Sequence, residues 1–167
     1  MNMIDSLAQL IFNIYEAFTV ALYATDKERL RCLSSMTFAS SFDRNRVLPV
    51  EGTLPGWVVK HKEPLIIPNF DKDEGTLGYY GSPEGVKSFM GYPVEDDGVI
   101  VIDSKKKYVF TDREKKILGG FVAVIHEELE RDKRSQEVDE KIEELRTEKR
   151  IIALLGHELS VKNCLHG

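Results

Sequence analysis

Cysteine is scarce in this chain of 167 residues, which contains only Cys32 and Cys164. One falls in an expected strand and the other near the end of the sequence, so they indicate neither a disulfide framework nor a thiolate metal site. Long apolar runs are missing too, because Asn13 and Glu16 interrupt the most apolar stretch near the beginning and no basic leader precedes it. A signal peptide or a membrane span is therefore not predicted. We expect a cytoplasmic segment in a reducing compartment.

Positive charge is limited. The 23 Lys and Arg residues are outnumbered by 28 Asp and Glu residues, which gives a formal net charge of -5. A net acidic chain has no general attraction to a phosphate backbone or to an anionic lipid surface. We expect binding neither to nucleic acid nor to a membrane.

The sequence signatures of common catalytic sites do not occur. There is no phosphate-binding G-x-x-x-x-G-K-[ST] loop, no G-x-S-x-G and no H-E-x-x-H. His61 lies between two lysines and His126 begins a highly charged segment, so neither suggests a metal site. We expect that this segment is not an enzyme and that it holds no cofactor or metal.

The chain does contain enough apolar sequence for one core. Hydrophobic residues make up 42% of the chain and charged residues 31%, which is the balance of a folded domain. A compact domain commonly holds about 100 to 150 residues. We therefore expect one domain over residues 1–130 and an appended segment over residues 131–167.

Periodic apolar patterns predict the elements of this domain. Apolar residues at helical spacing follow Asp5, a predicted N-cap, and predict a first helix. Alternating apolar residues then predict two β-hairpins. The strands of the first hairpin cover residues 20–24 and 30–38, and those of the second cover 88–94 and 98–104.

Two helices and a short strand complete the expected set. The segment "TLPGWVVKHK" predicts a helix with Pro55 in its first turn and with Trp57, Val58 and Val59 facing inward. "PLIIP" predicts a short strand. Thr111 and Glu114 have the spacing of a capping box, which predicts the start of the last helix.

A long irregular connection, "NFDKDEGTLGYYGSPEG", joins the two halves of the domain. It carries four of the twelve glycines together with Phe70, Tyr79 and Tyr80. Long loops in compact domains are usually functional or disordered. This loop has too much aromatic surface for a solvated linker, so we expect it to fold over something.

Residues 126–150 contain ten acidic and seven basic residues and neither Gly nor Pro, which predicts one long helix. Its sparse apolar residues keep a 4, 3, 7, 7 spacing, with Lys149 at one further seam position. Such spacing is typical of a two-stranded coiled coil. A solvated helix lying on its own domain is the alternative. The predicted dimer-helix residues are Val138, Ile142, Leu145, Ile152 and Leu159.

With its elements placed in this order, the chain resembles the GAF domain family, the small-molecule sensory modules of signalling proteins. Residues 4 to about 130 carry the resemblance, through "VEGTLPGWVVKHKEPLIIPNF", "VKSFMGYPV" and "GVIVIDSKKKYVFTDRE". It implies an α+β fold, an α/β sandwich with a central antiparallel sheet of five or six strands. The N- and C-terminal helices are expected on one face, loops around a pocket on the other, and a long C-terminal helix after them.

The expected ligand pocket has apolar walls and a few polar groups, as small-molecule sites do. Trp57 and Phe89 are alternatively core residues, and Asp71 is alternatively a turn former. Tyr79 and Tyr80 are equally suited to line a lid over the pocket. The predicted ligand-binding residues are Trp57, Phe70, Asp71, Tyr79, Tyr80, Ser88, Phe89, Tyr92 and Asp103.

The ligand itself is not identified by the sequence. Relatives that bind cyclic nucleotides often carry an Asn-Lys pair where this chain has Asp103 and Ser104, so a cyclic nucleotide is a minor alternative. Related photoreceptors attach a bilin through a pocket cysteine, whereas Cys32 is expected to be a small buried hydrophobe. Methionine-sulfoxide reductases of this architecture use several pocket cysteines, which the matching segments lack.

We therefore expect a cytosolic sensory domain of a bacterial regulator. It would bind an unknown small molecule, form a homodimer through its N- and C-terminal helices, and signal along a coiled coil. An effector domain, such as a kinase or a nucleotide cyclase, is expected to follow the segment. One alternative is a ligand-free dimerisation spacer. Another is the input part of a sensor histidine kinase, because "GHEL" resembles the phosphoacceptor helix and would make His157 the phosphoacceptor.

Overall fold

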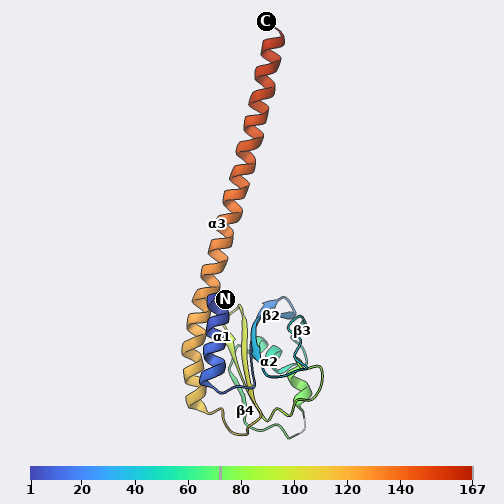
Figure 1. The fold of residues 1–167 in the computed structure, drawn as a ribbon, viewed down its shortest axis with the longest axis vertical. Coiled ribbons are helices and arrows are strands. Elements are labelled where there is room, and N and C mark those ends of the chain that lie inside the picture. Colours follow the sequence, from blue (N-terminus) through green and yellow to red (C-terminus); the bar gives the residue numbers. More distant parts are fainter. Residues whose placement is uncertain (72, 167) are drawn as a thin grey trace. The chain divides into compact units, whose positions relative to one another are not determined.

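The computed structural model describes residues 1–71 and 73–166. The chain divides into two compact units, Met1–Glu128 and Leu129–Gly167. The first unit contains a six-stranded antiparallel sheet with the strand order β3-β2-β1-β6-β5-β4. Figure 1 shows the chain as a ribbon coloured along the sequence. The strands are β1 (Thr19–Asp26), β2 (Arg29–Thr37), β3 (Leu48–Pro49), β4 (Leu65–Ile67), β5 (Ser88–Val94) and β6 (Gly98–Ser104).

Two hairpins form the centre of this sheet. β1 pairs with β2, β5 pairs with β6, and the two hairpins join where β1 pairs with β6. The second hairpin has the bounds that the sequence predicts. The expected sheet of five or six antiparallel strands is confirmed.

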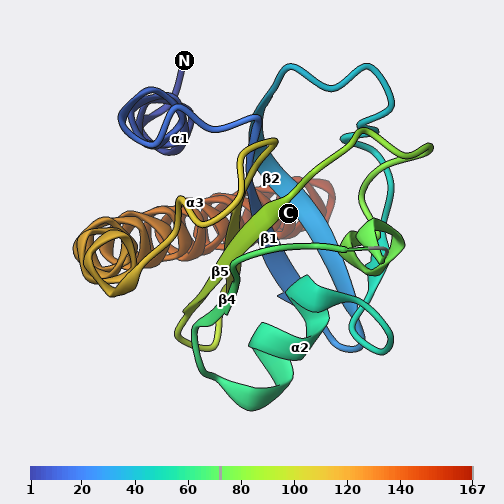
Figure 2. The ribbon, with the colours of Figure 1, turned by 90° about the horizontal axis from the view of Figure 1, so that it is seen from below.

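Helices α1 (Met3–Ile14) and α3 (Asp112–Leu165) cover one face of the sheet with residues of the first unit (Figure 2). In α1 the buried positions are Ile4, Ala8 and Ile11, at helical spacing. The buried α3 positions are Leu118, Val122 and Ile125. The Tyr15 hydroxyl, just after α1, donates a 2.8 Å hydrogen bond to the Glu114 carbonyl oxygen and so ties the two helices together.

The predicted N-cap of α1 is wrong. The helix begins at Met3, and the Asn2 side chain accepts a 2.8 Å hydrogen bond from the Asp5 backbone N–H. The Asp5 carboxylate instead accepts a 2.6 Å hydrogen bond from the Ser34 hydroxyl on β2. Asp5 therefore fastens α1 to the sheet.

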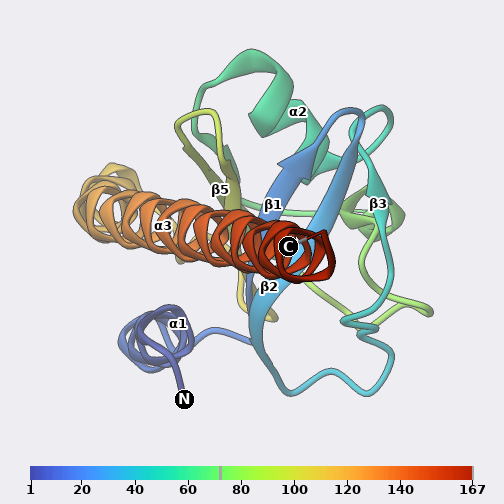
Figure 3. The ribbon, with the colours of Figure 1, turned by 90° about the horizontal axis from the view of Figure 1, so that it is seen from above.

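The opposite face of the sheet is covered by α2 (Leu54–His61), the 3-10 helix η1 (Glu74–Leu77) and their loops. Figure 3 shows α2 and α1 on opposite sides of the strands. Pro55 lies in the first turn of α2, as predicted, and Thr53 caps this helix. A Cβ at Gly56 would lie 1.8 Å from the Val50 carbonyl oxygen, so glycine is required for this close approach.

The prediction that Trp57 faces inward is wrong. Val58 is completely buried, whereas 36% of Trp57 is exposed and its ring stacks on His61 with centroids 4.1 Å apart. Residues four apart share one side of a helix. Trp57 and His61 therefore occupy the outer side of α2, while Val58 packs toward the sheet.

The helix α3 begins with the predicted capping box. The Glu114 carboxylate accepts hydrogen bonds from the backbone N–H of Thr111, at 3.0 Å, and from its hydroxyl. The unit Leu129–Gly167 is helical through Leu165, as the sequence predicts. Its five predicted dimer-helix residues are exposed. Among the described residues, no helix combines the length and the apolar character needed to cross a membrane.

Candidate ligand site on the loop face of the sheet

Asp103 is the centre of the candidate site. The alternation of β6 places this residue on the loop face of the sheet, where it is completely buried. Its Oδ2 atom accepts a 2.8 Å hydrogen bond from the Tyr79 hydroxyl and a 2.5 Å hydrogen bond from the Tyr80 hydroxyl. Two neighbouring tyrosines of the long connection over residues 69–85, which we call the aromatic loop, therefore hold one buried carboxyl group.

Burial dominates the protonation of this carboxyl group. Desolvation raises the pKa of Asp103 to about 7, although the hydrogen bonds from Tyr80 and Tyr79 act in the opposite direction. The pKa values of Tyr79 and Tyr80 are raised by burial and, second, by the Asp103 charge. Both tyrosines thus stay protonated and can donate to Asp103 at neutral pH.

The hydrogen bonds continue from Tyr80 across the sheet. The Tyr80 hydroxyl lies 2.5 Å from Thr19 Oγ1 on β1, which lies 2.7 Å from Thr37 Oγ1 on β2. The Thr37 hydroxyl also accepts a 2.9 Å hydrogen bond from the Ala39 N–H. A change at Tyr80 would therefore act on three strands.

Two buried polar atoms at this site lack a hydrogen-bond partner among the described residues: Asp103 Oδ1 and the Tyr23 hydroxyl. Tyr23, on β1, is 1% exposed and stacks on Tyr79 with ring centroids 6.4 Å apart. A buried polar group without a partner costs about 1 to 3 kcal/mol. These two atoms are therefore the groups that a bound molecule could satisfy.

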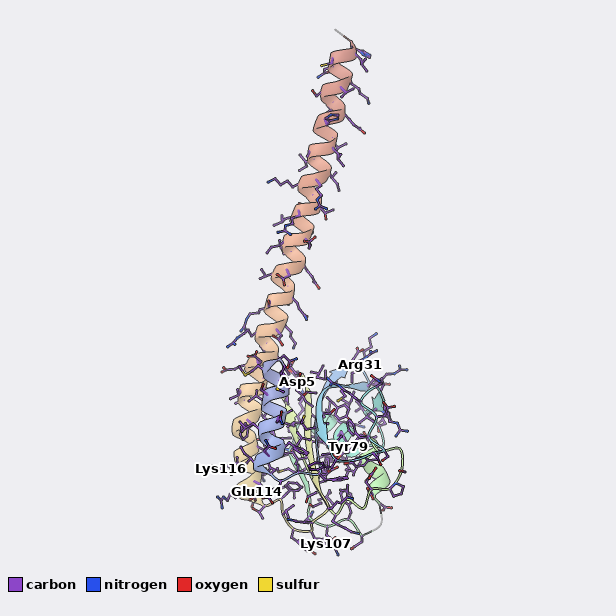
Figure 4. All side chains as sticks on the ribbon, in the orientation of Figure 1. Asp5, Arg31, Tyr79, Lys107, Glu114 and Lys116 are labelled. Atoms are coloured by element: carbon purple, nitrogen blue, oxygen red, sulfur yellow. The ribbon has the colours of Figure 1, made fainter. Side chains whose placement is uncertain are left out.

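Aromatic rings surround the carboxyl group. The Tyr79 and Tyr80 rings meet edge to face with centroids 4.7 Å apart. Phe42 contacts both rings, at 5.9 Å and 6.3 Å, and Phe18 lies 6.3 Å from Tyr80. Figure 4 shows Tyr79 inside the domain, between the sheet and the loops.

A small pocket lies next to Tyr80. Its volume is about 210 Å³. The carboxylate of Glu74, in this lining, accepts hydrogen bonds from the backbone N–H groups of Glu84, at 2.7 Å, and Gly85, at 3.0 Å. Tyr80 both lines the pocket and donates a hydrogen bond to Asp103. Movement of its side chain would therefore connect the pocket with the Asp103 carboxyl group. The lining consists of Glu74, Gly75, Gly78, Tyr80, Gly81, Ser82 and Pro83.

The structure brings together only some of the predicted ligand-binding residues. Tyr79, Tyr80 and Asp103 form one hydrogen-bonded group. Phe70 and Phe89 belong to the apolar core on the same face of the sheet, and Phe89 is completely buried. These five residues remain the candidate site.

The other four predicted residues lie elsewhere. Trp57 lines a separate pocket of about 250 Å³ beside α2. Asp71 is exposed and accepts a 3.0 Å hydrogen bond from the Asn69 amide, which fits a turn. Ser88 donates to the Lys106 carbonyl oxygen at 2.6 Å. Tyr92 is on the helix face, where a Cβ at Gly119 would lie 2.9 Å from its hydroxyl oxygen.

Sequence reasoning missed Phe18, Thr19, Tyr23 and Phe42. Thr19 pairs directly with Asp103 in the β1–β6 register. Tyr23 follows four residues later on β1 and therefore lies on the same face of the sheet. Strand alternation could therefore have found Thr19 and Tyr23. Phe42 reaches Tyr80 through an isolated β-bridge between two loops, for which no local pattern exists.

Cys32 fits its expected role as a small hydrophobe. It packs partly buried against the apolar core, and its thiol donates to the Ser34 carbonyl oxygen at 3.4 Å. Burial raises the pKa of this thiol, so the reactive thiolate is disfavoured.

A six-stranded antiparallel sheet with helices on one face and loops on the other defines an α+β domain. Residues 2–130 match the family model described as GAF domain, and the chain belongs to the GAF domain family. GAF domains occur in signalling proteins. No curated protein sequence matches the chain.

Solved structures share this fold. The GAF domain of an Acinetobacter phosphoenolpyruvate-protein phosphotransferase is 22% identical, with a TM-score of 0.61 over 71% of this chain and 75% of that one. The type II free methionine-R-sulfoxide reductase of Thermoplasma acidophilum is 16% identical, with a TM-score of 0.60 over 74% and 90%. The substrate complex of the Neisseria meningitidis reductase is 14% identical, with a TM-score of 0.65 over 75% of each chain. At these identities the similarity shows the fold alone.

Proposed function

We propose that this chain is the sensory part of a cytoplasmic signalling protein. Its GAF domain binds a small ligand at Asp103, and the resulting change passes through α3 to an effector. The observation that carries the proposal is the completely buried Asp103 carboxyl group, which has one unpartnered oxygen and is closed off by Tyr79 and Tyr80. A ligand that favours the open loop shifts the population by its differential affinity for that state.

The proposal assigns binding rather than catalysis to this segment. A reductase that cycles through a disulfide needs a second thiol to resolve the first. Residues 1–128 contain one cysteine, Cys32. Its thiol is partly buried and bonded to the backbone, which supports a non-catalytic role.

A route from the site to α3 is supported by the contacts of the segment between β6 and α3. The Lys106 carbonyl oxygen accepts a hydrogen bond from the hydroxyl of Ser88, the first residue of β5 after the aromatic loop. The Tyr108 N–H donates a 2.8 Å hydrogen bond to the carbonyl oxygen of Pro68, directly before that loop. Both ends of the aromatic loop are thus tied to the residues that lead into α3. Opening of the loop would shift the first turn of that helix.

Dimerisation is supported by the phase of the apolar residues along α3. Counting back from Ile142 and Val138 in steps of three and four passes three polar residues, Ser135, Arg131 and Glu128, before it reaches Val124, Phe121 and Ile117. Half of Val124 and 40% of Ile117 are exposed in the first unit. The heptad spacing of the apolar residues Val138, Ile142, Leu145, Ile152 and Leu159 favours pairing with a second copy of the chain.

A rival function is supported by the same packing. Tyr79 and Phe89 are completely buried, so the domain could act as a dimerisation spacer whose pocket stays filled. Denaturing the natively purified chain and analysing the released small molecules by mass spectrometry separates the two functions. The sensor requires a co-purifying compound, or one that raises the melting temperature in a dose-dependent way. If no compound co-purifies and none in a broad metabolite panel raises the melting temperature, the spacer function is supported.

Transmission requires its own measurement. Cysteines introduced at Val138 and at Ile142, one at a time, report the helix register through disulfide cross-linking between copies. A ligand-dependent change in the relative cross-linking rates would support signalling through α3. Equal rates with and without a bound ligand would contradict it, even where binding itself is established.

A further inference from the structure

We infer that the ligand of the Asp103 site is a small amine, bound through its ammonium group. This inference rests on the proposed sensory function and gives the chemical class of the ligand. Asp103 Oδ1 is the acceptor, Tyr80 moves aside, and the ammonium group lies between the carboxylate and the aromatic rings.

The charges at the site select the sign of the ligand. Asp103 is completely buried with Oδ1 unpartnered, and the pocket beside Tyr80 has Glu74 as its one charged lining residue. An anion in this pocket would lie beside Glu74 and, once Tyr80 moved aside, would approach the Asp103 carboxyl group as well. An ammonium group would instead provide the donor that Oδ1 lacks, and a charge-assisted hydrogen bond is stronger than a neutral one.

The rings favour a cation for a separate reason. The faces of aromatic rings carry negative potential, and cations are attracted to them at distances up to about 6 Å. Lys105 Nζ already lies over the Phe18 ring, the neighbour of Tyr80, at 4.3 Å from its centroid, so the ligand would have to use other rings. Phe42, Tyr79 and Tyr80 present further rings around the carboxyl group.

The size of the pocket limits the ligand. Its volume of about 210 Å³ is below the range of roughly 300 to 1,000 Å³ for drug-sized ligands. A second cation, Arg46, lies at the outer edge but uses its guanidinium to donate to the carbonyl oxygens of Tyr80, at 2.9 Å, and Gly78, at 3.4 Å. A short amine of a few carbon atoms fits this space and these charges.

Binding would be coupled to a proton. The titratable groups around Asp103 are Tyr23, Tyr79, Tyr80 and Glu74, and each tyrosine remains neutral because its pKa is raised. The pKa of Asp103 is about 7, so this group is partly protonated at neutral pH. An ammonium ligand stabilises the ionised form, so binding releases this proton and weakens about tenfold for each pH unit below 7.

The test uses isothermal titration calorimetry of the full chain with two amines that carry N–H donors, ethanolamine and putrescine. Glycolate and ethylene glycol serve as the anionic and neutral counterparts. We expect one or more of the amines to bind and the two counterparts not to bind. The affinity should fall from pH 8 to pH 6, and the observed heat should depend on the ionisation enthalpy of the buffer, as proton release requires.

Three variants locate the site. Asp103→Asn, which keeps the shape and removes the charge, should weaken amine binding at least tenfold and abolish its pH dependence. Tyr80→Phe removes the hydroxyl that bonds Asp103 but keeps the carboxylate, so this variant should still bind the amine. It provides a second test where Asp103→Asn does not fold. Glu51→Gln removes an exposed carboxylate that lines the other pocket and should bind like the wild type.

The outcomes separate this inference from the proposed function. Binding of glycolate in place of the amines, or amine binding that Asp103→Asn leaves intact, overturns the ligand class. Failure of every amine at millimolar concentration on the folded chain also overturns it. The sensory function stands or fails independently on whether a compound of any class co-purifies with the protein.

Discussion

The Tyr80 hydroxyl donates a 2.5 Å hydrogen bond to the buried carboxyl group of Asp103. This contact joins an aromatic loop to a central strand of the sheet, although the two residues lie 23 positions apart. The same strand leads into α3 within eight residues. The Tyr80 hydroxyl therefore links the closed loop to the strand that leads into α3, the helix that we propose to transmit the signal.

Removal of this hydroxyl should loosen the loop. Tyr80→Phe keeps the ring but loses the bonds to Asp103 and Thr19. Because one acceptor is a buried carboxyl group, we expect the free energy of unfolding to fall by about 1 to 3 kcal/mol. Urea unfolding measures this loss. Tyr108→Phe, at a residue that is 66% exposed, is the matched control and should lie within about 0.5 kcal/mol of the wild type.

The stability of the domain should carry a pH dependence that comes from Asp103. Its pKa is about 7 in the folded state and about 3.9 in an unfolded chain. The folded state therefore binds more protons between these values, so this residue makes stability fall as the pH rises from about 4 to 7. The slope approaches about 1.4 kcal/mol per pH unit.

Asp103→Asn provides the comparison for that slope. The difference in unfolding free energy between wild type and Asp103→Asn should decrease steadily from pH 4 to pH 7 and then level off. Subtracting the variant removes the opposing contribution of carboxylates with a lowered pKa, such as Glu84 and Glu114. A difference that does not change with pH would show that the pKa of Asp103 is not raised in the folded protein.

Much of the fold could be predicted because its signals are local. Two hairpins, the helix with Pro55 and the capping box at Thr111 each depend on neighbouring residues, and each is confirmed. Tyr79, Tyr80 and Asp103 were also within reach, because tyrosines in a glycine-rich loop and a polar residue on a buried strand are unusual in a sequence.

The wrong or missing predictions have a common physical cause. At these positions, contacts made in the folded chain decide where a side chain lies, and the local sequence does not show them. Asp5 resembles an N-cap, but its carboxylate bonds to Ser34 on the sheet and Asn2 caps the helix. Trp57 is large and apolar, but the outer side of α2 leaves it stacked on His61. Phe42 enters the site through a contact between two loops, which sequence periodicity cannot reveal.

Gly56 should be intolerant of a side chain. A Cβ there would overlap the Val50 carbonyl oxygen, and a backbone neighbour cannot move as a side chain can. Gly56→Ala is expected to destabilise the domain by about 1 to 3 kcal/mol through overpacking. Gly75→Ala, at a position with no atoms within 4 Å of a built Cβ, is the control and should change stability by less than about 1 kcal/mol. Thermal unfolding of both variants, monitored by circular dichroism, makes the comparison, and equal melting temperatures would contradict the close approach.

Lys149 shares the phase of Ile142, Leu145 and Ile152 along α3. A lysine at a seam position lowers the stability of a coiled coil, because its charge is desolvated between the helices. Lys149→Ile should therefore strengthen a parallel dimer, and Ile142→Lys should weaken it. Light scattering coupled to size exclusion, over a range of concentrations, gives the dissociation constants, and we expect changes of tenfold or more in opposite directions. Glu140→Lys, two residues before Ile142 and outside the seam, should leave the dissociation constant nearly unchanged. If all three variants dimerise alike, or if none does, the seam is not the interface and the part of α3 after Glu128 is a solvated helix.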